Sequence, residues 1–210
     1  MSTTRPGVWL AGALVLAFLL LFRLGEAQLV KLVTPFLLDP AAQGGLGLST
    51  SQVGIVYGTV GVAALTCGGL LGGWVVSLHG LKRWLWPMVA AIHMPDLLFV
   101  ALAAWQPQDI LLVAAAVAVE QFGYGFGFAA YLLFMILVAD GPAKTAHYAL
   151  CTGFMALGMM LPGMLSGWLQ QQLGYVNFFV WVCVATLPSV VLAFFLRIPP
   201  DFGRKEPEPR

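Results

Sequence analysis

Six apolar stretches, each long enough to cross a lipid bilayer, account for most of this 210-residue sequence. A helix needs about 20 predominantly apolar residues to span the hydrocarbon core of a membrane. The stretches cover residues 9–38, 53–78, 84–104, 110–138, 148–169 and 176–196. None of them shows the alternation of apolar and polar residues that is typical of strands. The sequence therefore predicts an all-α membrane protein with six transmembrane helices, the second of which opens with a capping box of Ser49 and Gln52.

The composition agrees with a surface that faces lipid. Hydrophobic residues make up 60% of the chain and charged residues only 9%, whereas about 25% of the residues in a typical soluble protein are charged. Membrane lipid is therefore an expected partner, and nucleic acid is not. Cys67, Cys151 and Cys183 are isolated in apolar stretches and lack metal-ligand spacing, so no metal or other cofactor is predicted.

The basic residues predict how the bundle is oriented. Eight of the ten lie on one side of the predicted membrane, and the three loops on the other side contain no Lys or Arg. The eight are Arg5, Lys82, Arg83, Lys144, Arg197, Arg204, Lys205 and Arg210. Because cytoplasmic loops are enriched in basic residues, both termini are expected to be cytoplasmic.

The predicted organisation is a cytoplasmic N-terminus at 1–7, a transmembrane domain at 8–197 and a disordered cytoplasmic tail at 198–210. An alternative interpretation treats residues 8–22, followed by Gly-Glu-Ala at 25–27, as a cleavable secretory signal. Cleavage there would leave five spans and place the C-terminus outside.

Three charged residues interrupt the first apolar stretch, namely Arg23, Glu26 and Lys31. Each charge near the bilayer centre costs about 2.5–3.5 kcal/mol on insertion scales. On a continuous helix the three share one broad face, so that face should contact protein or water. Arg23 and Glu26 can pair at the i,i+3 spacing, which leaves Lys31 without a partner in its own helix. The residues either line a cavity or form an internal salt bridge that fixes helix packing.

The fourth stretch places Glu120 near mid-membrane with no cation in its own helix. Burial favours the neutral form of such a carboxyl, so Glu120 is the predicted proton carrier and Glu26 the second choice. Gly123, Gly125 and Gly127 predict a close approach of helices or a flexible segment. Tyr124 belongs to a run of alternating aromatic residues that suits stacking on sugar rings, although lipid or core contacts are more common for such residues.

The third stretch contains His93, Pro95 and Asp96. His93 and Asp96, three residues apart, suit a proton relay, and two ligands on one helix are only a weak metal signal. The favoured interpretation is that Asp96 pairs with a cation on a neighbouring helix.

Several motifs resemble the major facilitator superfamily and, more narrowly, AmpG-type muropeptide permeases. They are FRLGEA, TPFLLD, HGLKRW, EQFGYGFG, HYAL and SGWLQQQLGY. The resemblance covers nearly the whole chain and corresponds to the second six-helix half of a twelve-helix transporter, built from two inverted three-helix repeats. Residues 72–83 are similar to the superfamily's cytoplasmic loop motif, but Ser77 stands where that motif carries an acid. The first and fourth helices of each half are expected to line the central cavity.

The resemblance implies a secondary transporter rather than an enzyme. Its expected activity is proton-coupled import of a cell-wall-derived muropeptide across the bacterial inner membrane, with Lys31 meeting a substrate carboxylate and Glu120 carrying the proton. A half needs a partner, which is either the N-terminal half of a longer transporter or a second copy. The alternatives are a receptor or scaffold with the transporter fold, and a membrane-embedded enzyme acting on lipid-linked sugars. The interpretation as an enzyme lacks support, because the sequence contains no serine–histidine, HExxH or paired-acid signature.

Overall fold

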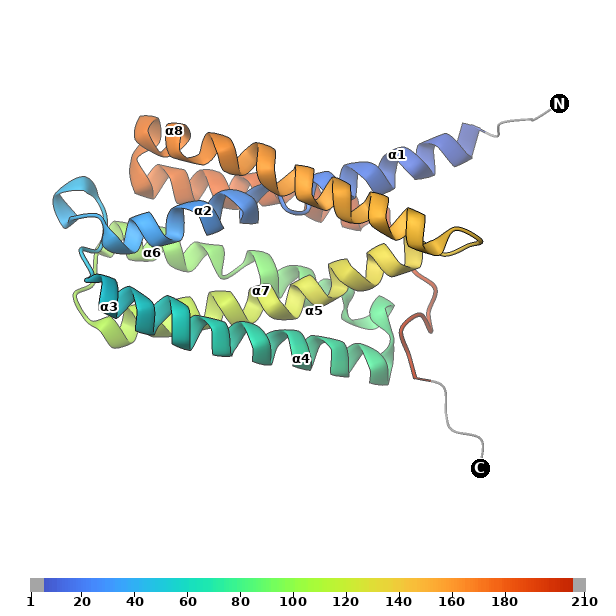
Figure 1. The fold of residues 1–210 in the computed structure, drawn as a ribbon, viewed down its shortest axis with the longest axis horizontal. Coiled ribbons are helices and arrows are strands. Elements are labelled where there is room, and N and C mark those ends of the chain that lie inside the picture. The colour runs from blue at the N-terminus through green and yellow to red at the C-terminus, as the bar shows by residue number, and fades with distance from the viewer. Residues whose placement is uncertain (1–5, 206–210) are drawn as a thin grey trace.

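The computed structural model describes residues 6–205, with side chains from residue 12 onward. Its helices form an elongated bundle and run along the long axis (Figure 1). The elements are α1 (Pro6–Leu21), α2 (Leu24–Leu38), the 3-10 helix η1 (Ala41–Gln43), α3 (Thr50–Val53), the π-helix η2 (Gly54–Gly61), α4 (Val62–His79), α5 (Leu81–His93), α6 (Asp96–Trp105), α7 (Ile110–Val138) and α8 (Lys144–Ala193). No strand occurs among the described residues, so the all-helical prediction is confirmed.

Within the described residues, five helical segments are long and apolar enough to cross a membrane. They are Gly12–Leu38, Thr50–His79, Leu81–Trp105, Ile110–Val138 and Lys144–Ala193. The fourth has the bounds that the sequence predicts, and the predicted capping box of Ser49 and Gln52 opens the second. Residues 1–5 of the predicted N-terminus, which include Arg5, lie outside the described residues. Residues 206–210 of the predicted tail also lie outside them.

Two of the predicted continuous helices are interrupted. The first breaks between Leu21 and Leu24, where Arg23 has φ −94° and ψ 0°. The third breaks at Met94 and Pro95, since proline has no backbone N–H to continue the helical hydrogen bonds. The first interruption contains neither glycine nor proline, which is why the sequence did not predict it.

The fifth and sixth apolar stretches lie in the two arms of α8. The chain reverses at Gly174, which has φ 72° and ψ 167°, a conformation that is accessible to glycine and strained for other residues. Figure 1 shows the arms running in opposite directions. The first arm covers residues 144–173 and the second 175–193.

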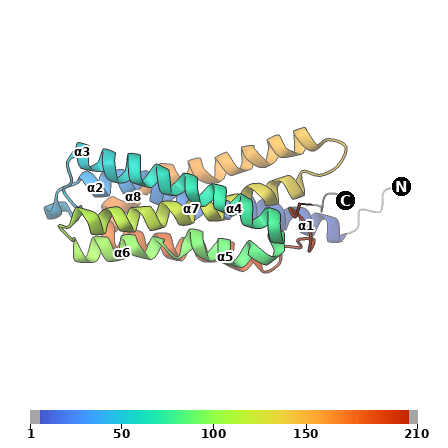
Figure 2. The ribbon, with the colours of Figure 1, turned by 90° about the horizontal axis from the view of Figure 1, so that it is seen from below.

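Helix α7 lies between α4 on one side and α5 and α6 on the other (Figure 2). The seam between α4 and α7 depends on glycine, because a Cβ at Gly125 would collide with the carbonyl oxygen of Leu65. A Cβ at Gly68 would likewise collide with the carbonyl oxygen of Phe122. The predicted close helix approach at Gly123, Gly125 and Gly127 is confirmed, because a Cβ at each would overlap a neighbouring helix.

The C-terminal segment at 198–205 differs from its predicted disorder, because it packs against the turn between α4 and α5. The backbone N–H of Leu81 donates to the Phe202 carbonyl at 2.8 Å, and that of Lys205 donates to the Ser77 carbonyl at 2.8 Å. Ile198 is buried. These apolar and backbone contacts outweigh the Pro-rich, charged composition from which disorder was predicted.

Candidate functional site

Four charged side chains are buried together in the interior, and we call them the buried charged cluster: Arg23, Glu26, Asp96 and Glu120. Their exposed fractions are 1%, 1%, 1% and 2%. Asp96 lies close enough to Glu26 and Glu120 for the three carboxyls to act electrostatically on one another. Arg23 lies in the break between α1 and α2, Glu26 in the first turn of α2, Asp96 at the start of α6 and Glu120 in the middle of α7. The cluster therefore joins three of the membrane-crossing segments.

Arg23 is held by aromatic residues rather than by a carboxylate. Its Nη2 donates to the Tyr124 hydroxyl at 2.6 Å, and its Cζ lies 4.9 and 4.8 Å from the ring centroids of Tyr124 and Phe128. Nη2 also lies 3.2 Å from the Met159 sulfur. Tyr124, one of the predicted pathway residues, therefore contacts Arg23. Such cation–π contacts are stronger away from water.

The prediction that Arg23 pairs with Glu26 is wrong. Across the described residues, no salt bridge joins the two, and both Glu26 oxygens lack a hydrogen-bond partner. The i,i+3 geometry requires a continuous helix, whereas the chain is interrupted at Arg23. Its guanidinium therefore reaches α7 instead of the face of α2 that carries Glu26.

The carboxyls of the cluster have almost no polar partners. Both Asp96 oxygens and Glu120 Oε1 are buried without a hydrogen bond in the described part of the chain, and Glu120 Oε2 accepts from Gln121 Nε2 at 3.0 Å. The prediction that Asp96 pairs with a cation on a neighbouring helix is therefore wrong. Burying an unpaired carboxylate costs several kcal/mol, so burial favours the neutral form of these groups.

Lys31 lies apart from the buried charged cluster, although the sequence predicts that it shares one helix face with Arg23 and Glu26. Its side chain is exposed, and its stem passes Gly163 of α8, where a Cβ would lie 3.3 Å from Lys31 Cγ. Three cavities of about 370, 640 and 290 Å³ are lined by other residues, none of them from the cluster. The cluster is enclosed by protein in this conformation.

His93 makes its hydrogen bond to Ser189 rather than to Asp96. Its Nε2 lies 3.1 Å from Ser189 Oγ, which itself donates to the Thr186 carbonyl at 2.7 Å. Because serine has a single hydroxyl proton, Nε2 must be the donor, and Nδ1 is left as an unpaired acceptor. No group of three or more His, Cys, Asp or Glu residues within the described chain could hold a metal ion.

Sequence reasoning missed Gln121, Phe128 and Met159, which complete the surroundings of the cluster. Gln121 was detectable as a polar neighbour of Glu120 inside an apolar stretch. Phe128 carried only the signal of the aromatic run, and nothing in the sequence relates Met159 to Arg23.

Several proteins with sequences similar to this chain carry the names of permeases or transporters. No protein-family model matches the chain. The chain is 25% identical over 200 residues to the "Anhydromuropeptide permease" of Escherichia coli K12, covering 95% of this chain and 39% of the relative. It is 25% identical over 179 residues to "Putative transporter AmpG 1" of Rickettsia prowazekii, covering 85% and 39% respectively. The resemblance to AmpG-type permeases is confirmed.

A Haemophilus influenzae "Uncharacterized protein" is 28% identical over 190 residues, or 86% of this chain and 43% of that one. The chain thus spans about two fifths of the length of these relatives. The AmpG-type relatives carry the names of transporters or permeases, which supports a protein that is not an enzyme. Together with the long apolar helices, they identify this chain as an integral membrane protein.

Proposed function

We propose that this chain is a six-helix half of a major facilitator superfamily transporter, and that it takes part in proton-coupled import of muropeptides across the bacterial inner membrane. The name of the Escherichia coli relative supports the substrate class. The transmembrane domain covers residues 8–197, and both termini face the cytoplasm. The second half of the pathway comes from an N-terminal half or from a second copy of the chain.

Six crossings follow if each arm of α8 spans the membrane once. The reversal at Gly174 separates two apolar arms that run in opposite directions. The chain then ends on the side where it began, which agrees with the basic residues at both ends. The arrangement also suits two inverted three-helix repeats.

The observation that carries the proton-coupling proposal is the set of buried carboxyls, none of which forms a salt bridge within the described residues. Ionisable residues inside membranes are costly and commonly mark proton or substrate pathways. Glu120 is the proton carrier in this proposal, with Glu26 second and Asp96 in electrostatic contact with both. Each can release a proton only when the enclosure opens to water, so proton transfer is tied to a conformational change.

The substrate site is the exposed face of α2 that carries Lys31. A cation on that face suits a substrate carboxylate, which forms a charge-assisted hydrogen bond with an ammonium group. A face of this kind is completed when a second half covers it. Lys31 and Glu120 therefore have separate roles, one in substrate binding and the other in coupling.

The test of coupling is uptake of labelled anhydro-muropeptide into membrane vesicles under an imposed pH gradient, with the complementary half or second copy present. Glu120→Gln is expected to abolish gradient-driven accumulation and to retain substrate binding. Val119→Ala changes the exposed neighbouring position and serves as the control. Accumulation by Glu120→Gln at the wild-type level would remove Glu120 from the pathway.

The same vesicles separate the competing functions. A membrane-embedded enzyme would release a chemically altered muropeptide, and a receptor would bind the ligand without accumulating it. A transporter returns the intact ligand from the vesicle interior.

The test of substrate binding compares Lys31→Met with Lys144→Met, which removes a basic residue at the end of the bundle. We expect Lys31→Met to weaken muropeptide binding about tenfold or more, because a hydrogen bond to a charged group is lost. Lys144→Met should leave the affinity unchanged. Equal affinities for the Lys31 variant and the wild type would contradict the assignment.

A further inference from the structure

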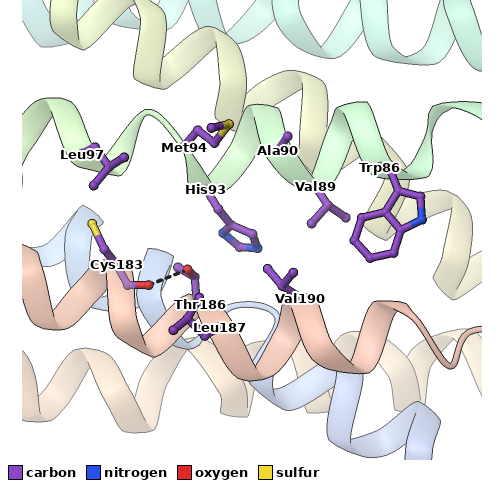
Figure 3. Close-up of a pocket in the computed structure, with 10 residues that line it drawn as sticks. All are labelled: Trp86, Val89, Ala90, His93, Met94, Leu97, Cys183, Thr186, Leu187 and Val190. Carbon is purple, nitrogen blue, oxygen red and sulfur yellow. Dashed lines mark hydrogen bonds between the residues drawn. The ribbon is translucent and has the colours of Figure 1, made fainter.

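A groove of about 370 Å³ lies on the outer surface of the bundle, between α5 and α6 on one side and the second arm of α8 on the other. Figure 3 shows Trp86 at one end of it, Leu97 and Cys183 at the other, and His93 reaching toward α8 between them. Its volume is within the range of about 300–1,000 Å³ that ligand sites occupy. Most of its lining is apolar, and Trp86, Met94 and Leu187 are exposed. The groove therefore opens where hydrocarbon surrounds the protein.

Three basic residues lie close in sequence to the aromatic pair at one end of the groove. Lys82 and Arg83 precede Trp86 by four and three residues on α5, so they lie on the same side of the helix one turn away. The rings of Trp86 and Phe194 lie 4.2 Å apart between centroids, and Arg197 follows Phe194 by three residues in the chain. All three basic residues are exposed.

No acidic side chain from these two elements opposes the cations. Residues 81–95 and 176–200 contain neither Asp nor Glu, and Asp201 lies 3.9 Å from Arg204. Tryptophan is enriched at the boundary between hydrocarbon and headgroups, so Trp86 fits the depth at which a lipid phosphate begins. Basic pockets between membrane helices recognise anionic headgroups.

We propose that this groove binds an anionic phospholipid, with one acyl chain between α5–α6 and α8 and the phosphate against Lys82, Arg83 and Arg197. The lipid holds the third apolar segment against the last one. It also lies behind the buried charged cluster, since His93 lines the groove and its ring is 5.3 Å from that of Phe22, the neighbour of Arg23. This inference is independent of the transported substrate.

A second groove provides a matched control. It has a volume of about 290 Å³, lies between α6 and α7, and is lined by apolar residues that include Ala115 and Trp105. Residues 98–119, which contain its whole lining, include no Lys or Arg. A lipid chain can therefore occupy it without headgroup selection.

The experiment is native mass spectrometry of the full 210-residue chain in detergent with equal amounts of dioleoyl phosphatidylglycerol and dioleoyl phosphatidylcholine. We expect the wild type to favour phosphatidylglycerol by about fivefold or more, because a single basic residue near the membrane surface contributes about that factor. Replacing Lys82, Arg83 and Arg197 together by Gln should abolish the preference. Ala90→Trp, which fills the groove, should reduce phosphatidylglycerol binding strongly, and Ala115→Trp should not.

Two results would overturn the proposal: an unchanged preference in the triple Gln variant, or full phosphatidylglycerol binding by Ala90→Trp. Circular dichroism of each variant establishes that it is folded. A diazirine on the acyl chain of phosphatidylglycerol gives an independent measurement on the wild type. It should label peptides from 86–97 and 183–190 in preference to peptides from 98–119, and labelling only of the latter would also refute the site.

Discussion

At the scale of single residues, Arg23 and three carboxyls are buried together in the bundle. No salt bridge joins them among the described residues. Arg23 rests on Tyr124 and Phe128, and Glu26 and Asp96 have no hydrogen-bond partners in the described chain. The electron-rich ring faces stabilise the buried guanidinium in part. Burial without hydrogen bonds favours the neutral form of the carboxyls.

The hydroxyl of Tyr124 is expected to stabilise the fold through Arg23. Tyr124→Phe leaves a buried guanidinium N–H without its acceptor, which should cost about 1–3 kcal/mol in the free energy of unfolding. In an Arg23→Met background the same substitution should cost much less, because the donor is gone. Unfolding by SDS titration in mixed micelles measures this coupling, and equal costs in both backgrounds would show that the hydrogen bond is not formed.

Asp96 provides a separate test of the unpaired carboxyls. Asp96→Asn keeps the shape of the side chain and removes its ability to ionise, so the unfolding free energy should change by less than about 1 kcal/mol. Breaking a buried ion pair would instead cost about 3–5 kcal/mol. A loss of that size in the same titration would mean that a cation pairs with Asp96 after all.

At the scale of helices, the seam between α4 and α7 depends on backbone approaching backbone. Gly125→Ala would place a methyl group against the Leu65 carbonyl, and overpacking of this kind costs about 1–3 kcal/mol. Gly73→Ala, on the open face of α4 with nothing within 4 Å, should be neutral or stabilising by up to about 1 kcal/mol. Thermal unfolding in detergent compares the two, and equal effects would argue against a tight seam.

The helices also show what the sequence could and could not predict. The bounds of α7 follow from its long apolar run, which Glu120 and Gln121 interrupt only at the centre, and from Asp109, whose side chain accepts a hydrogen bond from Leu111 N at 2.8 Å. The break at Phe22 and Arg23 has no helix-breaking residue to signal it, so its cause lies in tertiary packing. That packing includes the stacked rings of Phe22 and Tyr131, 5.0 Å apart.

For the candidate site, the sequence indicated which charged residues belong to it more reliably than which side chains they contact. An unusual charge in an apolar stretch is visible locally, which singles out Arg23, Glu26, Asp96 and Glu120. Tyr124 lies 101 residues from Arg23 in sequence, so only the packed bundle brings them together. The i,i+3 rule failed for Arg23 and Glu26 because it assumes a helix that the fold interrupts.

At the scale of the whole molecule, the number of crossings has a direct test. Six crossings place positions 43, 108 and 171 on one side of the membrane and positions 83, 144 and 204 on the other. Single cysteines introduced there, with Cys67, Cys151 and Cys183 replaced by alanine, should react with a membrane-impermeant maleimide from opposite sides of intact cells. Labelling of 171 together with 144 would show that the two arms of α8 do not cross separately.

The contact between residues 202–205 and the turn at 77–81 sets an order of events during biosynthesis. Those residues are made after all the apolar segments of the described chain, so the α4–α5 turn has no cover while the helices before them are being made. Chaperones and proteases therefore meet a surface on the growing chain that the finished protein conceals.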